Sequence, residues 1–321
     1  MKSPFTGKEM KPRYEKRSWK FRGDEYEYIH TSWICEDSGE SFTTDESDMV
    51  SFLQVTNQYR DRYGIPYQDE IVAIREYYNV SASKMSLILG FGANQWRYYE
   101  DGEVPSVSNG RMIRSIMTPS VFLEMLNSSK HLLTAKEYEK ISKNIVGNSR
   151  VDVGSRLYMC ERSKENGFGQ MDLNRLKNTL LYFIERIDKV FCTKMNKLLF
   201  YSDFLSYRLN GMSITGLTYK AIDYGPVPER WDRVYSYFDE IIQEPIVIGE
   251  KEGTILTTSE KADMSLFTDK EIYVLDTICS QFANCSSTEL SRISHNEPAW
   301  LDCHESHARI SYDYAFKLRG I

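Results

Sequence analysis

The spacing of apolar residues divides the chain into a short strand-forming start and a longer helical remainder. Polar and apolar positions alternate along DEYEYIHTSWIC, residues 24–35, and this period of two predicts a half-buried strand. Helical spacing follows in MVSFLQVTNQYRDRYG, residues 49–64, which ends at a glycine with Pro66 just beyond. We therefore expect a small β ribbon over residues 1–45 and a connecting helix over residues 46–66.

Residues 67–130 contain helical apolar periods separated by turn signals. Ser81 is the expected N-cap of the second helix, and the GFG turn at residues 90–92 separates it from a third helix, ANQWRYYE. Helix, tight glycine turn and helix at this spacing is the pattern of a helix-turn-helix. The residues expected to face its core are Ile71, Ile74, Tyr78, Met85, Ile88, Leu89, Ala93, Trp96, Tyr99, Val107, Met112, Ile113 and Ile116.

The second half of the chain predicts further helices and one hairpin. Residues 131–170 comprise a helix that begins with a capping box, Thr134 and Glu137, and then a linker rich in Gly, Asn and Ser. Residues 171–321 form a separate domain with a β hairpin in EPIVIGEKEGTILTTS around a Lys-Glu-Gly turn. Its expected helices are 172–187, 194–209, 228–242, 268–283, 286–294 and a short one after Ser311. The expected fold class is α+β, mostly α.

Composition limits the function classes. The chain has 321 residues, of which 41% are hydrophobic, and its net charge of −6 argues against a surface that binds polyanions everywhere. Any nucleic-acid contact must therefore be local. There is no 18-residue apolar run, and the six cysteines form no CxxC pair. These features favour a cytoplasmic protein that binds no membrane.

The expected third helix presents side chains that can recognise bases. Asn94, Gln95, Arg97 and Tyr98 would face outward, and asparagine and glutamine pair with adenine while arginine pairs with guanine or phosphate. Ser83 and Lys84, near the start of the second helix, are placed to contact phosphate. The alternative is a four-helix scaffold whose polar side chains are only solvated.

The charge of this module is balanced, with seven basic and seven acidic residues between residues 60 and 114. A neutral module binds DNA weakly unless it dimerises or borrows charge, because phosphate neutralisation supplies most of the non-specific affinity. The basic stretch at residues 1–22 could lend that charge or could belong to a protein interface.

Residues 67–127 resemble the C-terminal helix-turn-helix of MqsA-type antitoxins. The matching words are SASKMSLILGFG, AN and YEDGEVPS, followed by an apolar helix. In that family an Asn and an Arg of the recognition helix contact bases. The Asn matches Asn94, whereas the Arg position holds Tyr98 with Arg97 one place earlier. The resemblance implies a homodimer that binds an inverted repeat in operator DNA as a transcriptional repressor.

The N-terminal part of the MqsA family is a zinc-binding domain with two CxxC pairs. The corresponding words here are SPFTG (Ser3, Thr6) and CEDSG (Cys35, Ser38), so hydroxyls replace three of the four thiolates. Neutral hydroxyls are poor ligands for structural Zn²⁺, and His30 alone cannot complete the set. The resemblance thus implies a degenerate zinc ribbon without metal, and we expect no cofactor.

Residues 171–321 resemble the Panacea, or SocA-like, antitoxin domain. Four sequence segments occur in the same order as in the family. They are KMNKLLFYSDFLSY, ITGLTYKAIDYGPVPERW, LSRISHNEPAW and ARISYDYAF. The family neutralises diverse toxins, and some members hand a toxin to a protease, which implies a co-encoded toxin and a protease as candidate partners. The motif residues, as candidates for toxin binding or for maintaining the fold, are Tyr201, Tyr224, Gly225, Pro226, Val227, Trp231, His295 and Trp300.

Within this domain we expect Gly225 to provide a turn, with Tyr224 and Trp231 packed beside the core. The exposed aromatic and acidic residues around the helix expected at 228–242 would face the toxin.

An enzyme is the weaker interpretation. His295, Cys303, His304 and His307 invite a metal or hydrolase assignment, but no HExxH, P-loop or GxSxG word is present. We expect no catalytic residue and a type II antitoxin that neutralises its toxin and represses its own operon. The alternatives are an interaction adaptor that binds no DNA, and a transcription factor whose C-terminal domain senses a ligand.

Overall fold

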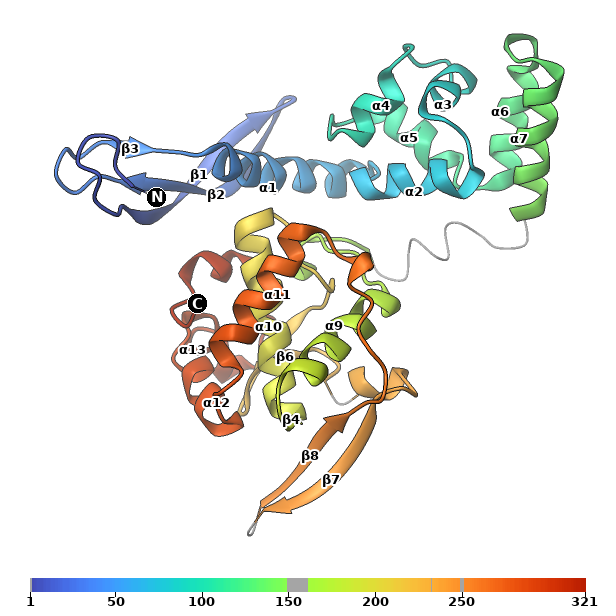
Figure 1. Cartoon of the computed structure of the whole chain (residues 1–321). Coiled ribbons are helices and arrows are strands. Elements are labelled where there is room, and N and C mark those ends of the chain that lie inside the picture. Colours follow the sequence, from blue (N-terminus) through green and yellow to red (C-terminus); the bar gives the residue numbers. More distant parts are fainter. Residues whose placement is uncertain (1, 149–160, 232, 249–250) are drawn as a thin grey trace. The chain divides into compact units, whose positions relative to one another are not determined.

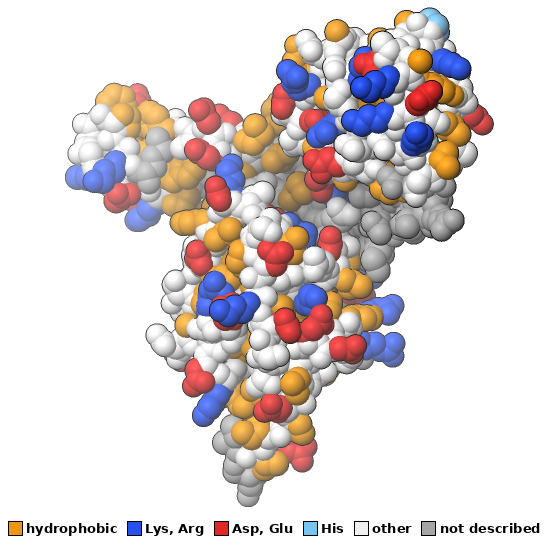
Figure 2. All heavy atoms as spheres, turned by 45° about the vertical axis from the view of Figure 1, so that its right-hand side comes forward, with side chains coloured by type: hydrophobic (Ala, Val, Ile, Leu, Met, Phe, Trp, Pro, Cys, Tyr) orange, Lys and Arg blue, Asp and Glu red, His pale blue; other side chains and the backbone are white. Residues whose placement is uncertain are grey.

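The computed structural model describes residues 2–148, 161–231, 233–248 and 251–321. These residues are mostly helical with small antiparallel sheets, which confirms the expected α+β, mainly helical fold. The chain divides into two compact units (Figure 1): Met1–Val55 together with Arg162–Ile321, and Thr56–Glu161. Figure 2 shows acidic and basic side chains interspersed on the face in view. In the part of the chain that the structure describes, no helix is both long and apolar enough to span a membrane.

The N-terminal ribbon is a long hairpin. Strands β1 (Lys11–Phe21) and β2 (Asp24–Ile34) pair antiparallel, and β3 (Ser41–Phe42) pairs with the end of β2. The turn between β1 and β2 consists of Arg22 and Gly23, both at positive φ, which matches the right-handed twist of the strands. The strand predicted at residues 24–35 is therefore confirmed.

Helix α1 (Asp45–Tyr63) follows the ribbon and closes one edge of it. The Gln54 amide exchanges two hydrogen bonds with the backbone of Ile29, accepting at 2.9 Å and donating at 3.0 Å. A side chain thereby satisfies backbone groups that β2 would otherwise leave unpaired at its edge. The rings of Trp19 and Phe21 also contact Phe52 of the helix.

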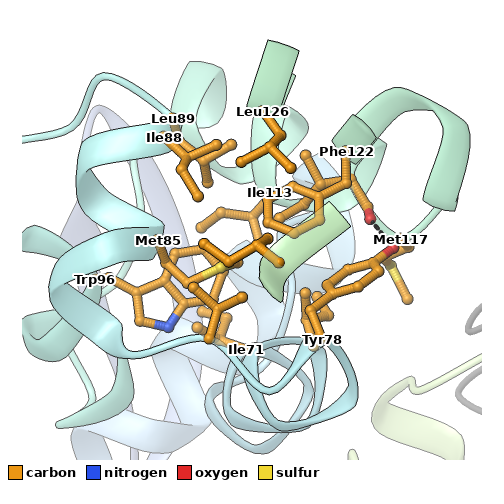
Figure 3. Packing of buried hydrophobic residues seen from close by; sticks show 14 of the residues in the cluster. Ile71, Tyr78, Met85, Ile88, Leu89, Trp96, Ile113, Met117, Phe122 and Leu126 are labelled. Carbon is orange, nitrogen blue, oxygen red and sulfur yellow. Dashed lines mark hydrogen bonds between the residues drawn. The ribbon is translucent and has the colours of Figure 1, made fainter. Parts of the chain in front are cut away.

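The unit Thr56–Glu161 is a helical bundle. Its elements after α1 are α2 (Gln68–Tyr78), α3 (Ala82–Ile88), α4 (Gln95–Glu100), α5 (Val107–Ser115), α6 (Pro119–Ser128), a 3₁₀ turn (Lys130–Leu132) and α7 (Ala135–Asn148). Most residues predicted to face inward do so, and Figure 3 shows several of them around Trp96 and Ile113. Val107 and Met112 are half-buried. Ala93 is exposed, contrary to prediction, because α4 begins only at Gln95.

The C-terminal part of the other unit surrounds one central helix, α10 (Cys192–Asn210), which is buried without interruption from Lys194 to Tyr207. Around it lie α9 (Leu173–Arg186), α11 (Asp269–Phe282), α12 (Ser287–His295) and α13 (Pro298–Leu301). Two small sheets complete it, in the orders β4-β8-β7 and β5-β6. The strands are β4 (Val190–Phe191), β5 (Tyr219–Ile222), β6 (Gly225–Pro228), β7 (Ile242–Ile248) and β8 (Lys251–Thr257). The 3₁₀ turns are Lys164–Asn166, Val234–Tyr237, Met264–Leu266, His304–Ser306 and Tyr312–Lys317.

The helix expected at 228–242 is wrong. Strand β6 ends at Pro228, a 3₁₀ turn occupies Val234–Tyr237, and β7 begins at Ile242. The spacing of apolar residues in this segment resembles that of a helix, but here a loop and a 3₁₀ turn carry the buried side chains. These are Val234, Tyr235, Phe238 and Ile241. The predicted hairpin is confirmed as β7 and β8, but its expected Lys-Glu-Gly turn is wrong. Lys251, Glu252 and Gly253 begin β8 and pair with Ile248, Val247 and Ile246. The turn itself lies outside the described residues.

Candidate functional site

Helices α3 and α4 form the candidate recognition element. The Ser81 hydroxyl caps α3 by accepting from the Lys84 amide, and Gly90 follows α3 with φ of +69°. The Trp96 amide donates to the Ser86 hydroxyl at 2.9 Å, and the indole of Trp96 is fully buried. These contacts fix the rotation of α4 about its axis, and so they fix which of its side chains face solvent.

The predicted base-contacting residues differ in availability. Asn94, Arg97 and Tyr98 are exposed, and Arg97 makes no ion pair within the described chain. Gln95 is half-buried, and its amide donates to a Glu103 carboxylate oxygen at 3.0 Å. The outer side of α4 therefore presents an amide, a guanidinium and a phenol together.

The predicted phosphate contacts near the start of α3 are partly engaged. The Ser83 hydroxyl is exposed and lies 3.2 Å from that of Ser81. The Lys84 ammonium lies 2.9 Å from a Glu137 carboxylate oxygen of α7, and this contact holds the pKa of Glu137 well below its usual range. Lys84 is therefore partly neutralised within the protein.

A second candidate surface is the turn between β5 and β6. Side chains from α10, α12 and α13 form hydrogen bonds with backbone carbonyls in and beside this turn. The Trp300 indole donates to the Ile222 carbonyl at 2.7 Å, and the Lys197 ammonium donates to the Pro226 carbonyl at 3.0 Å. His295 Nε2 lies 3.0 Å from the Asp223 carbonyl. Three separate anchors make this turn rigid.

Gly225 is required in this turn. Its φ is +97°, and a Cβ there would lie 2.9 Å from the Lys197 ammonium and 2.8 Å from the Ser294 hydroxyl. Pro226 and Val227 are buried, and the buried Tyr201 hydroxyl donates to Glu297 at 3.0 Å. These motif residues contribute to the fold.

Tyr224 and Trp231 lie on the surface, which corrects the expectation that they pack beside the core. Tyr224 is 68% exposed and Trp231 is 41% exposed. The reason is that the turn is anchored through its carbonyls, so the Tyr224 side chain at its tip is not needed for packing. The motif thus separates into a buried frame and exposed aromatic side chains.

The ribbon carries two turns with matching hydrogen bonds. The amides of Ser3 and Cys35 donate to the carbonyls five residues later, at 2.8 and 2.9 Å, and the following glycines donate back at 2.9 and 2.8 Å. Gly7 and Gly39 have similar φ values of +68° and +73°. The two turns meet where the Ser3 hydroxyl donates to the Cys35 sulfur at 3.1 Å.

The donors at this meeting point do not fit a structural zinc ion. Ser3, Thr6 and Ser38 supply hydroxyls, and Cys35 is the one thiol among the four equivalent positions. Hydrogen bonds from Ser3 and Ser38 lower the pKa of Cys35 to about 6. The two turns therefore match in backbone geometry, but their side chains do not offer the ligands of a structural zinc site.

We predict that the triple variant Ser3→Cys, Thr6→Cys, Ser38→Cys binds one zinc ion per chain, because four thiolates would then converge from two matched turns. Zinc content of the purified variant, measured after dialysis, checks this. Adding Cys35→Ser to the variant should remove most of the zinc. A triple variant that carries no more zinc than the wild type would contradict the equivalence of the two turns.

Lys197 is a buried cation that the sequence analysis missed. It is 1% exposed, and burial lowers its pKa to about 7. A lysine in an apolar helical stretch is normally interpreted as solvent-facing, so the only available signal was its place inside KMNKLLFYSDFL. Burial on all sides of α10 explains the difference.

The lowered pKa of Lys197 predicts a pH dependence. Between about pH 7 and pH 10 the unfolded chain binds more protons at this residue than the folded chain does, so the free energy of unfolding rises with pH. In Lys197→Met this contribution is absent. From about pH 7 to 9 the wild type should gain about 1–2 kcal/mol relative to the variant, measured by denaturant unfolding. Parallel pH profiles would contradict the assignment.

Two of the histidines near the C-terminus pack against one tryptophan ring. The rings of His295 and His304 contact Trp300, with centroids 4.3 and 4.1 Å from its ring centroid. Among the described residues no group of three or more His, Cys, Asp or Glu side chains is arranged to hold a metal ion.

The comparison with protein families bears on the surface around the β5–β6 turn. Residues 195–301 match the family model "Antitoxin SocA-like, Panacea domain". The match spans one third of the 321 residues. It includes the β5–β6 turn with Tyr224, the exposed Trp231, His295 and Trp300. No curated protein and no solved structure matches the chain significantly. The Panacea match supports an antitoxin role and favours a regulator over an enzyme.

Proposed function

We propose that this protein is an antitoxin that binds and neutralises a co-encoded toxin through its Panacea domain and represses its own operon through its helix-turn-helix. The observation that carries the proposal is the antitoxin-family match over residues 195–301, which contain a rigid turn with an exposed aromatic tip. The division of labour assigns DNA binding to residues 67–130 and neutralisation to residues 171–321.

The toxin-binding surface centres on exposed aromatic residues. Tyr224, Trp231 and Tyr237 are 68%, 41% and 53% exposed, and all lie between β5 and β7. Tyrosine and tryptophan dominate the binding energy of protein interfaces, and a rigid turn limits the entropy lost on binding. Neutralisation would then be occlusion of the toxin's active surface.

The DNA-binding surface is the outer side of α4, where Asn94, Arg97 and Tyr98 are exposed. A homodimer would place two such helices in successive major grooves of an inverted repeat, with half-sites ~34 Å apart. Tyr98 occupies the position of the arginine in MqsA-type proteins, so the operator sequence should differ from theirs.

The proposal is tested with the product of the neighbouring, co-transcribed gene. We expect the two proteins to co-purify at fixed stoichiometry, and we expect the antitoxin to shift duplex DNA from upstream of its own gene. Separate elution of the two proteins would refute neutralisation by binding, while failure to shift the duplex at low salt would refute autoregulation.

A second candidate, an adaptor that binds no DNA, is favoured by the ion pair between Lys84 and Glu137 and by the balanced charge of residues 60–114. Such an adaptor would use α3 and α4 for protein contacts and could pass the toxin to a protease. The salt dependence of the DNA shift separates the candidates, since a true DNA complex weakens steeply as salt rises.

A further inference from the structure

The proposed DNA binding requires positive charge near the recognition helix. Neutralising backbone phosphates requires cations that the protein does not already pair. The basic stretch at residues 1–22 does not meet this condition well, because much of it is paired with acids of the ribbon. The ion pairs are Lys8–Asp37, Lys11–Glu36, Lys16–Glu27, Arg13–Glu15 and Arg17–Glu15. Lys84 is paired with Glu137.

Helix α7 has an unpaired basic side. Lys136, Lys140 and Lys143 are spaced at i, i+4 and i+7, so they lie along one side of the helix, and all three are exposed. None of them makes an ion pair with any residue that the structure describes. We call these three residues the α7 lysine stripe. Figure 2 shows Lys and Arg side chains on the visible face of this helical unit, with Asp and Glu side chains among them.

The opposite side of α7 is fixed to the core of the same unit. Ile141 and Ile145 are buried in the hydrophobic cluster, and the Asn144 amide donates to the Tyr78 carbonyl at 3.1 Å. The orientation of the stripe is therefore set by packing, and its lysines face solvent because the apolar face is held inward.

We propose that the α7 lysine stripe binds the phosphate backbone of DNA beside the recognition helix. This inference rests on the proposed DNA-binding function and assigns to α7 positive charge beyond that of Arg97 in α4, because Lys84 of α3 is already paired with Glu137. The Lys84–Glu137 pair joins the first turns of α3 and α7, so the stripe begins next to the helix-turn-helix.

The dimensions suit a phosphate strand. Seven residues of helix rise by about 10 Å, and phosphates of one strand follow at ~3.4 Å along the duplex axis, so three lysines span about three phosphates. Backbone contacts carry no base information, so the stripe contributes affinity and positioning while the choice of sequence stays with α4.

The test is a titration of the full-length triple variant Lys136→Gln, Lys140→Gln, Lys143→Gln against the upstream duplex and an unrelated duplex at several salt concentrations. At about 0.1 M salt we expect affinity for both duplexes to fall by about tenfold or more. The slope of log K against log salt should shrink by roughly 2–3, since each phosphate contact contributes about 0.9. The ratio of the two affinities should not change.

Two controls separate local from global charge. Lys189→Gln, Lys261→Gln, Lys270→Gln changes the net charge equally at exposed sites outside both the helical unit and the basic stretch, and it should leave binding unaltered. Glu139→Gln, which removes an acid next to the stripe, should strengthen binding to both duplexes.

The outcomes distinguish this inference from the proposed function. If the wild type binds the upstream duplex and the stripe variant binds with the same affinity and salt slope, the stripe is refuted and autoregulation stands. If the control triple variant weakens binding as much as the stripe variant, the effect is global charge and the stripe is refuted. If the wild type binds neither duplex at low salt, both the stripe and autoregulation are refuted.

Discussion

We expect the double variant Asn94→Ala, Arg97→Ala to lose specific binding to the DNA upstream of its gene by about 100-fold or more. Each well-formed side-chain contact to a base contributes about 1–3 kcal/mol of discrimination, and two are removed. Binding to an unrelated duplex should change much less. The measurement is a competition titration of the upstream duplex against the unrelated one.

The control for this variant is Gln95→Ala. Gln95 lies in the same helix but is half-buried and hydrogen-bonded to Glu103, so its removal should have a smaller effect on specificity. Asn94 and Arg97 are exposed and lie outside the core cluster, so the double variant should keep the wild-type melting temperature. Unchanged preference for the upstream duplex in the double variant would show that α4 is not the recognition helix.

The double variant Tyr224→Ala, Trp231→Ala should bind the toxin about 30-fold to 1,000-fold more weakly. Truncating hot-spot aromatic residues costs about 2–4 kcal/mol, and taken as the combined loss for this pair that corresponds to the stated range. Both residues are exposed beside a turn held by three side-chain contacts. Calorimetric titration of the purified pair measures the affinity, and DNA binding by the same variant should be unaffected.

A matched control is Tyr273→Ala, because Tyr273 is 63% exposed but belongs to α11 rather than to the segment between β5 and β7. We expect it to keep the wild-type toxin affinity. Equal loss in Tyr273→Ala, or wild-type affinity in the Tyr224 and Trp231 variant, would place the toxin on a different surface.

Local sequence patterns predicted the helical core well. Helical spacing located Ile71, Tyr78 and Trp96 in the interior because amphipathic periodicity depends on one element at a time. The prediction that Ala93 is buried was wrong because α4 begins later than expected, at Gln95. The start of α4 depends on the path that the chain takes out of the GFG turn, and helix propensity does not encode that path.

Features that depend on distant residues could not be predicted. The carbonyls of the β5–β6 turn are held by Lys197, His295 and Trp300, which are far from it in sequence, so Tyr224 was wrongly expected to pack inward. The pairing of Lys84 with Glu137 likewise joins residues more than fifty positions apart. Single-residue chemistry identified the candidates, but their availability for a partner depends on tertiary contacts.

The most direct test of the antitoxin assignment is growth of cells that express the co-transcribed neighbouring gene, with and without this protein at matched levels. We predict that the neighbour alone arrests growth and that the full-length chain restores it, whereas the Tyr224 and Trp231 variant does not. A harmless neighbour, or arrest that persists in the presence of the wild-type chain, would contradict the account.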